Sequence, residues 1–79
     1  MEQRIAIVGI VVDEPNSVEL LNGILHVYKD DIIGRMGLPY RARGISLISV
    51  IMDAPQQRIE ALAEQIGALP GVKVSTLYS

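Results

Sequence analysis

The feature that most constrains the fold is an internal repeat with an offset of 40 residues. Residues 5–15 align with residues 45–55, and each segment is an apolar run rich in β-branched residues that ends in Asp-x-Pro. Such a run is typical of a buried strand, and Pro is tolerated in the first turn of a helix. The repeat therefore predicts two halves, each of which begins with a strand and continues into a helix.

After each Pro, apolar residues follow the i, i+3, i+4, i+7 spacing of one helix face. They are Val18, Leu21, Ile24, Leu25 and Tyr28 in the first half, and Ile59, Leu62, Ala63, Ile66 and Leu69 in the second. These helical patterns match at an offset of 41, one residue more than the strands. We expect Asp13 and Asp53 to cap the helices by accepting hydrogen bonds from free N–H groups, with Gln56 as a capping-box partner of Asp53.

Two further strands are expected at residues 31–36 and 71–77, the second entered through the helix stop and turn Leu69-Pro70-Gly71. The resulting order is βαββαβ. Two right-handed βαβ units of this kind form a ferredoxin-like α+β sandwich, with a four-stranded antiparallel sheet and two helices on one face. We expect one such domain over residues 1–79, because 79 residues allow no second one.

Both faces of the first and third predicted strands are apolar. One face carries Ile5, Ile7, Val11, Leu47 and Ile51, and the other carries Val8, Ile10, Val12, Ile48, Val50 and Met52. An antiparallel sheet with one wet face alternates apolar and polar residues, and this one does not. We therefore expect a homo-oligomer, a dimer or a tetramer, in which a second subunit covers the helix-free face or a sheet edge. The alternative is that β-branched residues occupy solvent-facing strand positions through propensity alone.

The composition excludes several function classes. Seven Lys and Arg against nine Asp and Glu give a net charge of −2, which argues against direct nucleic-acid binding. Phe and Trp are absent, so the sheet lacks most of the aromatic residues that RNA-binding versions of this topology stack on bases. Cys is absent, and the longest apolar stretch, residues 5–12, is too short to span a membrane. We expect a soluble, cytoplasmic protein that is not an enzyme and has no cofactor.

Several segments together resemble a known bacterial family, the regulators of the iron-only hydrogenase system. They are residues 12–15, 28–41, 44–50 and 69–72 together with Tyr78-Ser79. The resemblance covers essentially the whole chain and implies an ACT-like fold and a role in regulation, including transcriptional regulation. ACT domains carry Asp-x-Pro-Gly at the first strand–helix turn, where they bind amino-acid effectors. By this resemblance Asp13 and Asn16 belong to a candidate ligand site, with Asn16 in the place of the Gly.

The segment from Gly34 to Gly44 is the second candidate for ligand binding. It contains three Gly, one Pro and one Tyr, and its three Arg give it a charge of +3 while the rest of the chain sums to −5. A flexible connection between strands that carries guanidinium groups can hold a carboxylate or a phosphate. The candidate residues are Arg35, Tyr40, Arg41 and Arg43. The alternative is a long hairpin loop whose Arg side chains pair with acids of a neighbouring subunit, such as Asp30 and Asp31.

Metal and acid–base sites have weaker support. His26 and Asp30 have helical spacing, but a metal site would need ligands from further subunits, since the chain has one His and no Cys. The carboxylates Asp13, Glu14 and Asp53 are better explained as helix-start residues than as catalysts. The sequence thus favours a non-enzymatic regulatory domain that senses a small, anionic ligand or docks on a partner regulator protein. The alternatives are a ligand-free assembly module and a metal-sensing domain.

Overall fold

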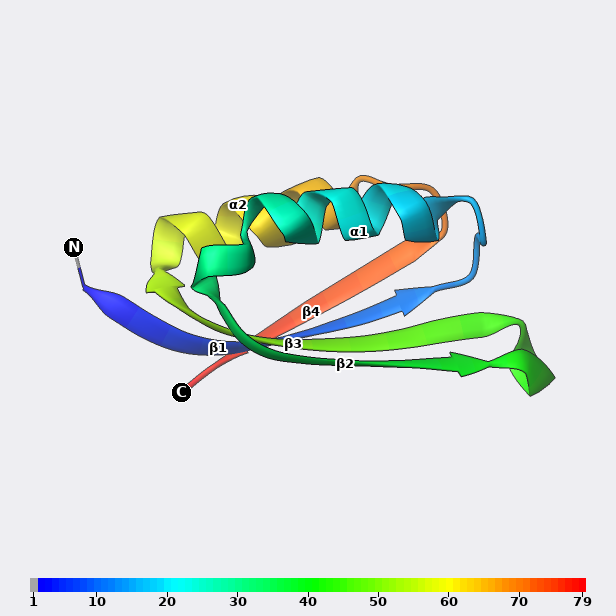
Figure 1. Cartoon of the computed structure of the whole chain (residues 1–79), viewed down its shortest axis with the longest axis horizontal. Coiled ribbons are helices and arrows are strands. Elements are labelled where there is room, and N and C mark those ends of the chain that lie inside the picture. Colours follow the sequence, from blue (N-terminus) through cyan, green and yellow to red (C-terminus); the bar gives the residue numbers. More distant parts are fainter. Residues whose placement is uncertain (1) are drawn as a thin grey trace.

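The computed structural model describes residues 2–79 and contains one four-stranded sheet and two α-helices (Figure 1). In chain order the elements are β1 (Gln3–Val12), α1 (Ser17–Val27), the 3-10 helix η1 (Lys29–Asp31), β2 (Ile32–Tyr40), the 3-10 helix η2 (Arg41–Arg43), β3 (Ile45–Pro55), α2 (Gln56–Gly67) and β4 (Val72–Tyr78).

The strands lie in the order β2-β3-β1-β4, and all three neighbouring pairs are antiparallel. Both helices lie on the same side of the sheet (Figure 1). This is the ferredoxin-like βαββαβ arrangement, so the predicted fold class is confirmed. The two repeated strands, β1 and β3, are central neighbours in the sheet.

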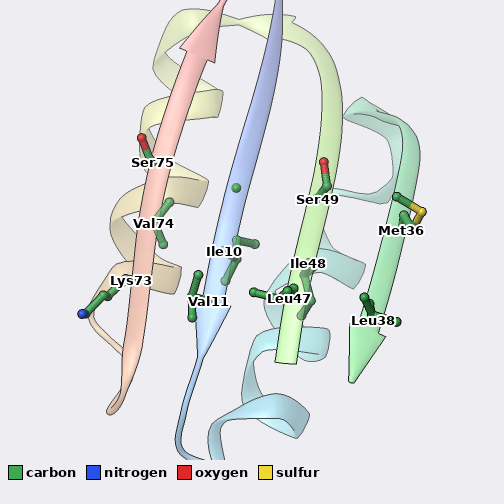
Figure 2. A pocket seen from close by; sticks show the side chains of 11 residues that line it. Ile10, Val11, Met36, Leu38, Leu47, Ile48, Ser49, Lys73, Val74 and Ser75 are labelled. Carbon is green, nitrogen blue, oxygen red and sulfur yellow. The ribbon is translucent and has the colours of Figure 1, made fainter. Parts of the chain in front are cut away.

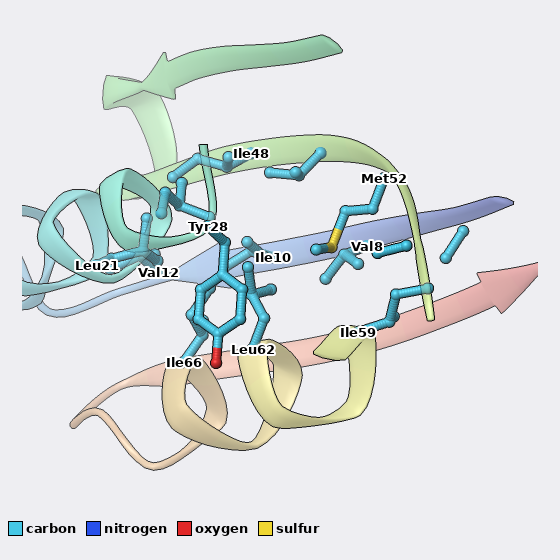
Figure 3. Close-up of a cluster of buried hydrophobic side chains, with 14 residues drawn as sticks. Val8, Ile10, Val12, Leu21, Tyr28, Ile48, Met52, Ile59, Leu62 and Ile66 are labelled. Carbon is cyan, nitrogen blue, oxygen red and sulfur yellow. The ribbon is translucent and has the colours of Figure 1, made fainter. Parts of the chain in front are cut away.

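The core lies between the sheet and the two helices (Figure 3). Alternate residues of β1 and β3 point into it, and the helices contribute the residues at the predicted spacing. Its buried side chains are Ala6, Val8, Ile10, Val12, Leu21, Leu25, Tyr28, Ile48, Val50, Met52, Ala54, Ile59, Leu62 and Ile66. The helices therefore cover the strand face that carries Val8 and Val50, and leave the face that carries Ile7 and Leu47 without a helix.

The predicted helix caps are wrong. Helix α1 begins at Ser17 and α2 at Gln56, and neither has a side-chain hydrogen bond at its cap. Strand β3 continues through Pro55, so Asp53 is a strand residue whose Cα partner is Ile5. At the other junction it is Glu14 that accepts a hydrogen bond, from the backbone N–H of Asn16 at 3.2 Å.

The predicted flexible connection over Gly34–Gly44 is also wrong. Strand β2 continues to Tyr40, which pairs with Ile45, and only the η2 turn and Gly44 connect the two strands. Gly44 has φ 65°, a left-handed conformation that lets the chain reverse directly after η2. The long strand β3 supplies backbone partners for β2 over this whole length, and this pairing outweighs the flexibility of the glycines.

A polar cluster ties helix α2 to the connection between α1 and β2. Arg58 forms a salt bridge with Asp31 at 2.7 Å, and its guanidinium lies 4.9 Å from the ring centroid of Tyr28. The Tyr28 hydroxyl accepts a hydrogen bond from Gln65 at 3.0 Å. Asp31 is thus paired within the subunit, which weakens the hypothesis that it serves as an intersubunit partner for the Arg residues of β2 and η2.

Candidate functional site

The helix-free face of the sheet exposes a continuous set of large apolar side chains. Its members are between 36% and 72% exposed, and they come from all four strands: Ile5, Ile7 and Val11 of β1, Met36 and Leu38 of β2, Leu47 and Ile51 of β3, and Leu77 of β4. We call this set the apolar sheet face. It spans about 20 Å along the strands and about 14 Å between the outer strand axes, or roughly 300 Å² in projection. The largest apolar patch of an ordinary monomer is of this size and is often functional, which makes the apolar sheet face a candidate interaction surface.

A row of small residues crosses the middle of the apolar sheet face. Gly9 lies at its centre and pairs with Ser49 on one side and Ser75 on the other, and Met36 pairs with Ser49 at the β2 edge. The flanking rows are larger: Leu38, Leu47, Val11 and Lys73 on one side, and Ile51, Ile7 and Leu77 on the other. The small row leaves a shallow hollow of about 530 Å³ (Figure 2). The face is therefore a trough between two ridges.

Among residues 2–79, the charged residues of this face lie at its margins. Lys73 stands opposite Val11 on the outer strand β4, and Asp53 stands opposite Ile5 towards the other end of the sheet. These two opposite charges therefore mark two ends of the apolar sheet face. If a second copy faced this surface with its strands running in the opposite direction, the end that carries Lys73 would lie over the end that carries Asp53.

The six ligand-binding candidates do not gather at one place. Arg35 is on the helix side of β2 and donates a hydrogen bond to Asn22 Oδ1 at 3.0 Å. Tyr40 is 46% exposed at the end of β2, in register with the residues of the apolar sheet face. Arg41 and Arg43 are exposed in η2, and only Arg41 lines a hollow, of about 310 Å³.

Asp13 and Asn16 lie in the turn between β1 and α1 and are exposed. The backbone N–H of Asp13 donates to the carbonyl of Gly71 at 2.9 Å, so this turn packs against the turn before β4. The hollow next to Arg41 includes Pro15 of the same turn but neither Asp13 nor Asn16. The two halves of the predicted ligand site are thus neighbours at one end of the molecule without forming a single pocket.

The metal and acid–base candidates are dispersed as well. His26 is exposed on α1, and residues 2–79 contain no group of three His, Cys, Asp or Glu side chains arranged to hold a metal ion. Asp13 follows the end of β1, whereas Asp53 pairs with Ile5 about 26 Å away along the strands. These carboxylates therefore cannot act together on one substrate.

Met36 and Leu38 belong to the apolar sheet face, although Met36 was expected at the end of a strand and Leu38 in a loop. The signal was present as the alternation Met36-x-Leu38-x-Tyr40, which has the period of a strand. The sequence also carries a signal for the row of small residues, since Gly9 aligns with Ser49 in the repeat. Helices α1 and α2, within the part of the chain that the structure describes, are too short to cross a membrane.

The topology and the uncovered sheet face define this chain as a ferredoxin-like α+β domain with helices on one face only. Residues 4–76, nearly the whole chain, match the model of the TM1266-like family, described as "Iron-only hydrogenase system regulator, putative". The chain belongs to this family, and the resemblance drawn from the sequence is confirmed.

One solved structure supports this placement, and a second shares the fold. The uncharacterized protein TM1266 from Thermotoga maritima is 32% identical, with 98% of each chain covered and a TM-score of 0.93. The C-terminal domain of the MgtC protein from Mycobacterium tuberculosis is 16% identical and has a TM-score of 0.70, over 96% of this chain and 87% of that one. The second likeness shows the shared fold alone. No curated protein matches this chain.

Proposed function

We propose that this chain is a non-enzymatic regulatory module that works in the cytoplasm as a homo-oligomer, with two copies joined through their apolar sheet faces. The observation that carries the proposal is the exposure of eight large apolar side chains on the sheet face opposite the helices. Burial of apolar surface stabilises association by about 25 cal/mol per Å² before the entropic cost of joining the subunits. The module would regulate another protein, including a transcription factor, by presenting this assembly to it.

The relief of the apolar sheet face fits a second copy. In a dimer with two-fold symmetry the same surface of both subunits forms the interface. If the two-fold axis lies between the facing sheets, one ridge of each copy can enter the trough of the other. Sheets packed in this way lie about 10 Å apart, which suits aliphatic side chains such as Ile7 and Leu47. With the copies turned end for end, Lys73 of each approaches Asp53 of the other.

A charge placed on the apolar sheet face is expected to separate the subunits. The double variant Met36→Lys, Leu77→Lys changes side chains that are 72% and 66% exposed in one subunit, so the subunit itself should still fold. Light scattering at micromolar concentration should give a multiple of the 8.6 kDa chain mass for the wild type and a single chain mass for the variant.

The matched control is Leu20→Lys, Val27→Lys, which changes side chains that are 57% and 71% exposed on helix α1. It adds the same charge to the opposite side of the molecule and should leave the oligomer intact. A monomeric wild type, or dissociation by the helix variant alone, would contradict the proposal.

The second candidate function is sensing of a small anion at the end of the β2–β3 hairpin. The hollow beside Arg41 combines that guanidinium with the apolar Pro15 and Val18 and has a volume within the usual range for ligand pockets. Within residues 2–79, no side chain forms a hydrogen bond or salt bridge with Arg41 or Arg43, so both guanidinium groups remain available.

If this hollow senses an anion, citrate should raise the melting temperature of the wild type, since a ligand that prefers the folded state stabilises it. The double change Arg41→Ala, Arg43→Ala should abolish that rise while the melting temperature without citrate stays within a few degrees of the wild type. Dissociation of the oligomer by this variant, with no citrate effect in the wild type, would favour a ligand-free assembly module.

A further inference from the structure

A groove runs between helix α1 and the outer strand β2, on the helix side of the sheet. It consists of three adjoining hollows of about 240, 260 and 310 Å³. The first two share Asn22 and Arg35, and the second and third share Val18, Pro39 and Ser46. Because neighbouring hollows have lining residues in common, they form one continuous depression, which we call the α1–β2 groove.

The groove exists because β2 turns small residues towards the helix layer. Gly37 pairs with Ile48 of β3, and Pro39 pairs with Ser46. These two β2 positions therefore lie on the face of the sheet that the helices cover. A Cβ added at Gly37 would lie 4.0 Å from Ile48 Cγ1, an ordinary contact distance, so glycine is not required there by packing. Its absence of a side chain keeps the middle of the groove open.

Every ionisable side chain that lines the groove is basic. His26, Lys29 and Arg35 lie at one end, and Arg41 lies at the other. Among residues 2–79, no Asp or Glu lines any of the three hollows, although the chain carries a net charge of −2. Apolar side chains line the same hollows: Val18, Leu25, Ile32 and Ile48.

The spacing of these charges selects an elongated ligand. Arg35 and Tyr40 are five strand residues apart, which separates their Cα atoms by about 17 Å, and Arg41 follows Tyr40 directly. The Arg35 guanidinium is held on Asn22 and does not line the hollow beside Arg41, so this structure does not direct the two guanidinium groups at one carboxylate or phosphate. An extended chain with acidic side chains about every second residue places carboxylates at intervals of about 7 Å and meets both ends.

We infer that the α1–β2 groove binds an extended acidic segment of a partner protein, with its carboxylates on Arg35 and Arg41 and its apolar side chains on the floor beside Gly37. Arg35 is already oriented by its hydrogen bond to Asn22 and keeps further N–H donors for a carboxylate. The groove lies on the helix side of the sheet, so it remains open when two copies join through their apolar sheet faces. The inference therefore goes beyond the proposed function and does not depend on it.

The probe is a fluorescein-labelled octapeptide of alternating Glu and Leu, measured by fluorescence polarisation against the full chain. We expect saturable binding that weakens as salt is raised, because exposed charges are screened, and no binding of the Gln and Leu counterpart. The change Arg35→Gln with Arg41→Gln should weaken binding at least tenfold. Arg43→Gln removes a charge from the same turn but not from the groove, and it should change the affinity less than twofold.

A second variant separates a groove from a merely basic surface. Gly37→Val fills the floor without changing any charge and should also weaken peptide binding at least tenfold, while the melting temperature is maintained. The monomeric variant Met36→Lys, Leu77→Lys should bind as the wild type does, so failure of self-association is distinguishable from failure of the groove.

Three results would overturn the inference. The first is no saturable peptide binding by the wild type. The second is an equal loss of affinity in Arg43→Gln and in the double Arg variant. The third is complete displacement of the peptide by citrate at the same carboxylate concentration, which would identify a site for a small anion instead.

Discussion

Lysine in place of Val8 and Ile48 should unfold this protein, whereas lysine in place of Ile7 and Leu47 should leave a folded monomer. Val8 is fully buried and Ile48 is 8% exposed, and both face the helices. Burying an ammonium group there costs several kcal/mol per residue, which is comparable to the whole stability of a small domain. Ile7 and Leu47 are 43% and 36% exposed in one subunit, so lysine at these positions can reach water.

Circular dichroism and light scattering on the two double variants check this expectation. The first variant should lose its helical signal at 25 °C, and the second should keep it and run at one chain mass. If both variants were folded oligomers, Val8 and Ile48 would not be buried beneath the helices as the structure has them. If both were unfolded, the apolar sheet face would be part of an obligate core rather than a separable interface.

Gly71→Ala should have the second-largest effect, a loss of about 2–4 kcal/mol of stability. Gly71 has φ 69°, a left-handed conformation that costs any residue with a Cβ. A Cβ would also collide with the Asp13 carboxylate and lie 2.7 Å from Glu14 Cβ and 3.0 Å from the Glu14 nitrogen. For a domain of this size the loss corresponds to a fall in melting temperature of roughly 10–25 °C in a thermal denaturation scan.

Gly44→Ala is the matched control for this prediction. Gly44 has φ 65°, close to that of Gly71, but a Cβ there would meet no atom within 4 Å. Only the backbone strain remains, so we expect a loss of about 1 kcal/mol. Equal losses at the two glycines would show that the contact between the β1–α1 turn and the turn before β4 contributes nothing.

The order of elements was predictable because its signals are local. A strand and an amphipathic helix have different periods, and the repeat shows each period twice. The ends of the elements were less predictable. Strand β2 was expected to stop at Met36, yet it continues to Tyr40, because its backbone pairs with β3. Such pairing joins distant parts of the chain and outweighs local glycine content.

The candidate ligand-binding residues were also predictable only as far as local sequence allows. Arg35, Arg41 and Arg43 are close in sequence, which made them look like one cluster. In the folded chain Arg35 faces the helix side of β2 about 17 Å from the strand end, and Arg43 lines none of the hollows that Arg35 and Arg41 line. A strand rises about 3.3 Å per residue, so residues six positions apart in a strand lie farther apart than they would in a compact loop.

Residue type and period are enough to predict the two βαβ halves and the apolar character of both faces of β1 and β3. They are not enough to predict which face the helices cover. Both faces of β1 and β3 are apolar, so the alternation of residues along these strands does not distinguish one face from the other. In the folded chain the apolar sides of both helices pack over Val8 and Val50, and this contact between distant segments settles the choice. That choice left Ile7 and Leu47 exposed, and the same arrangement opened the groove between α1 and β2.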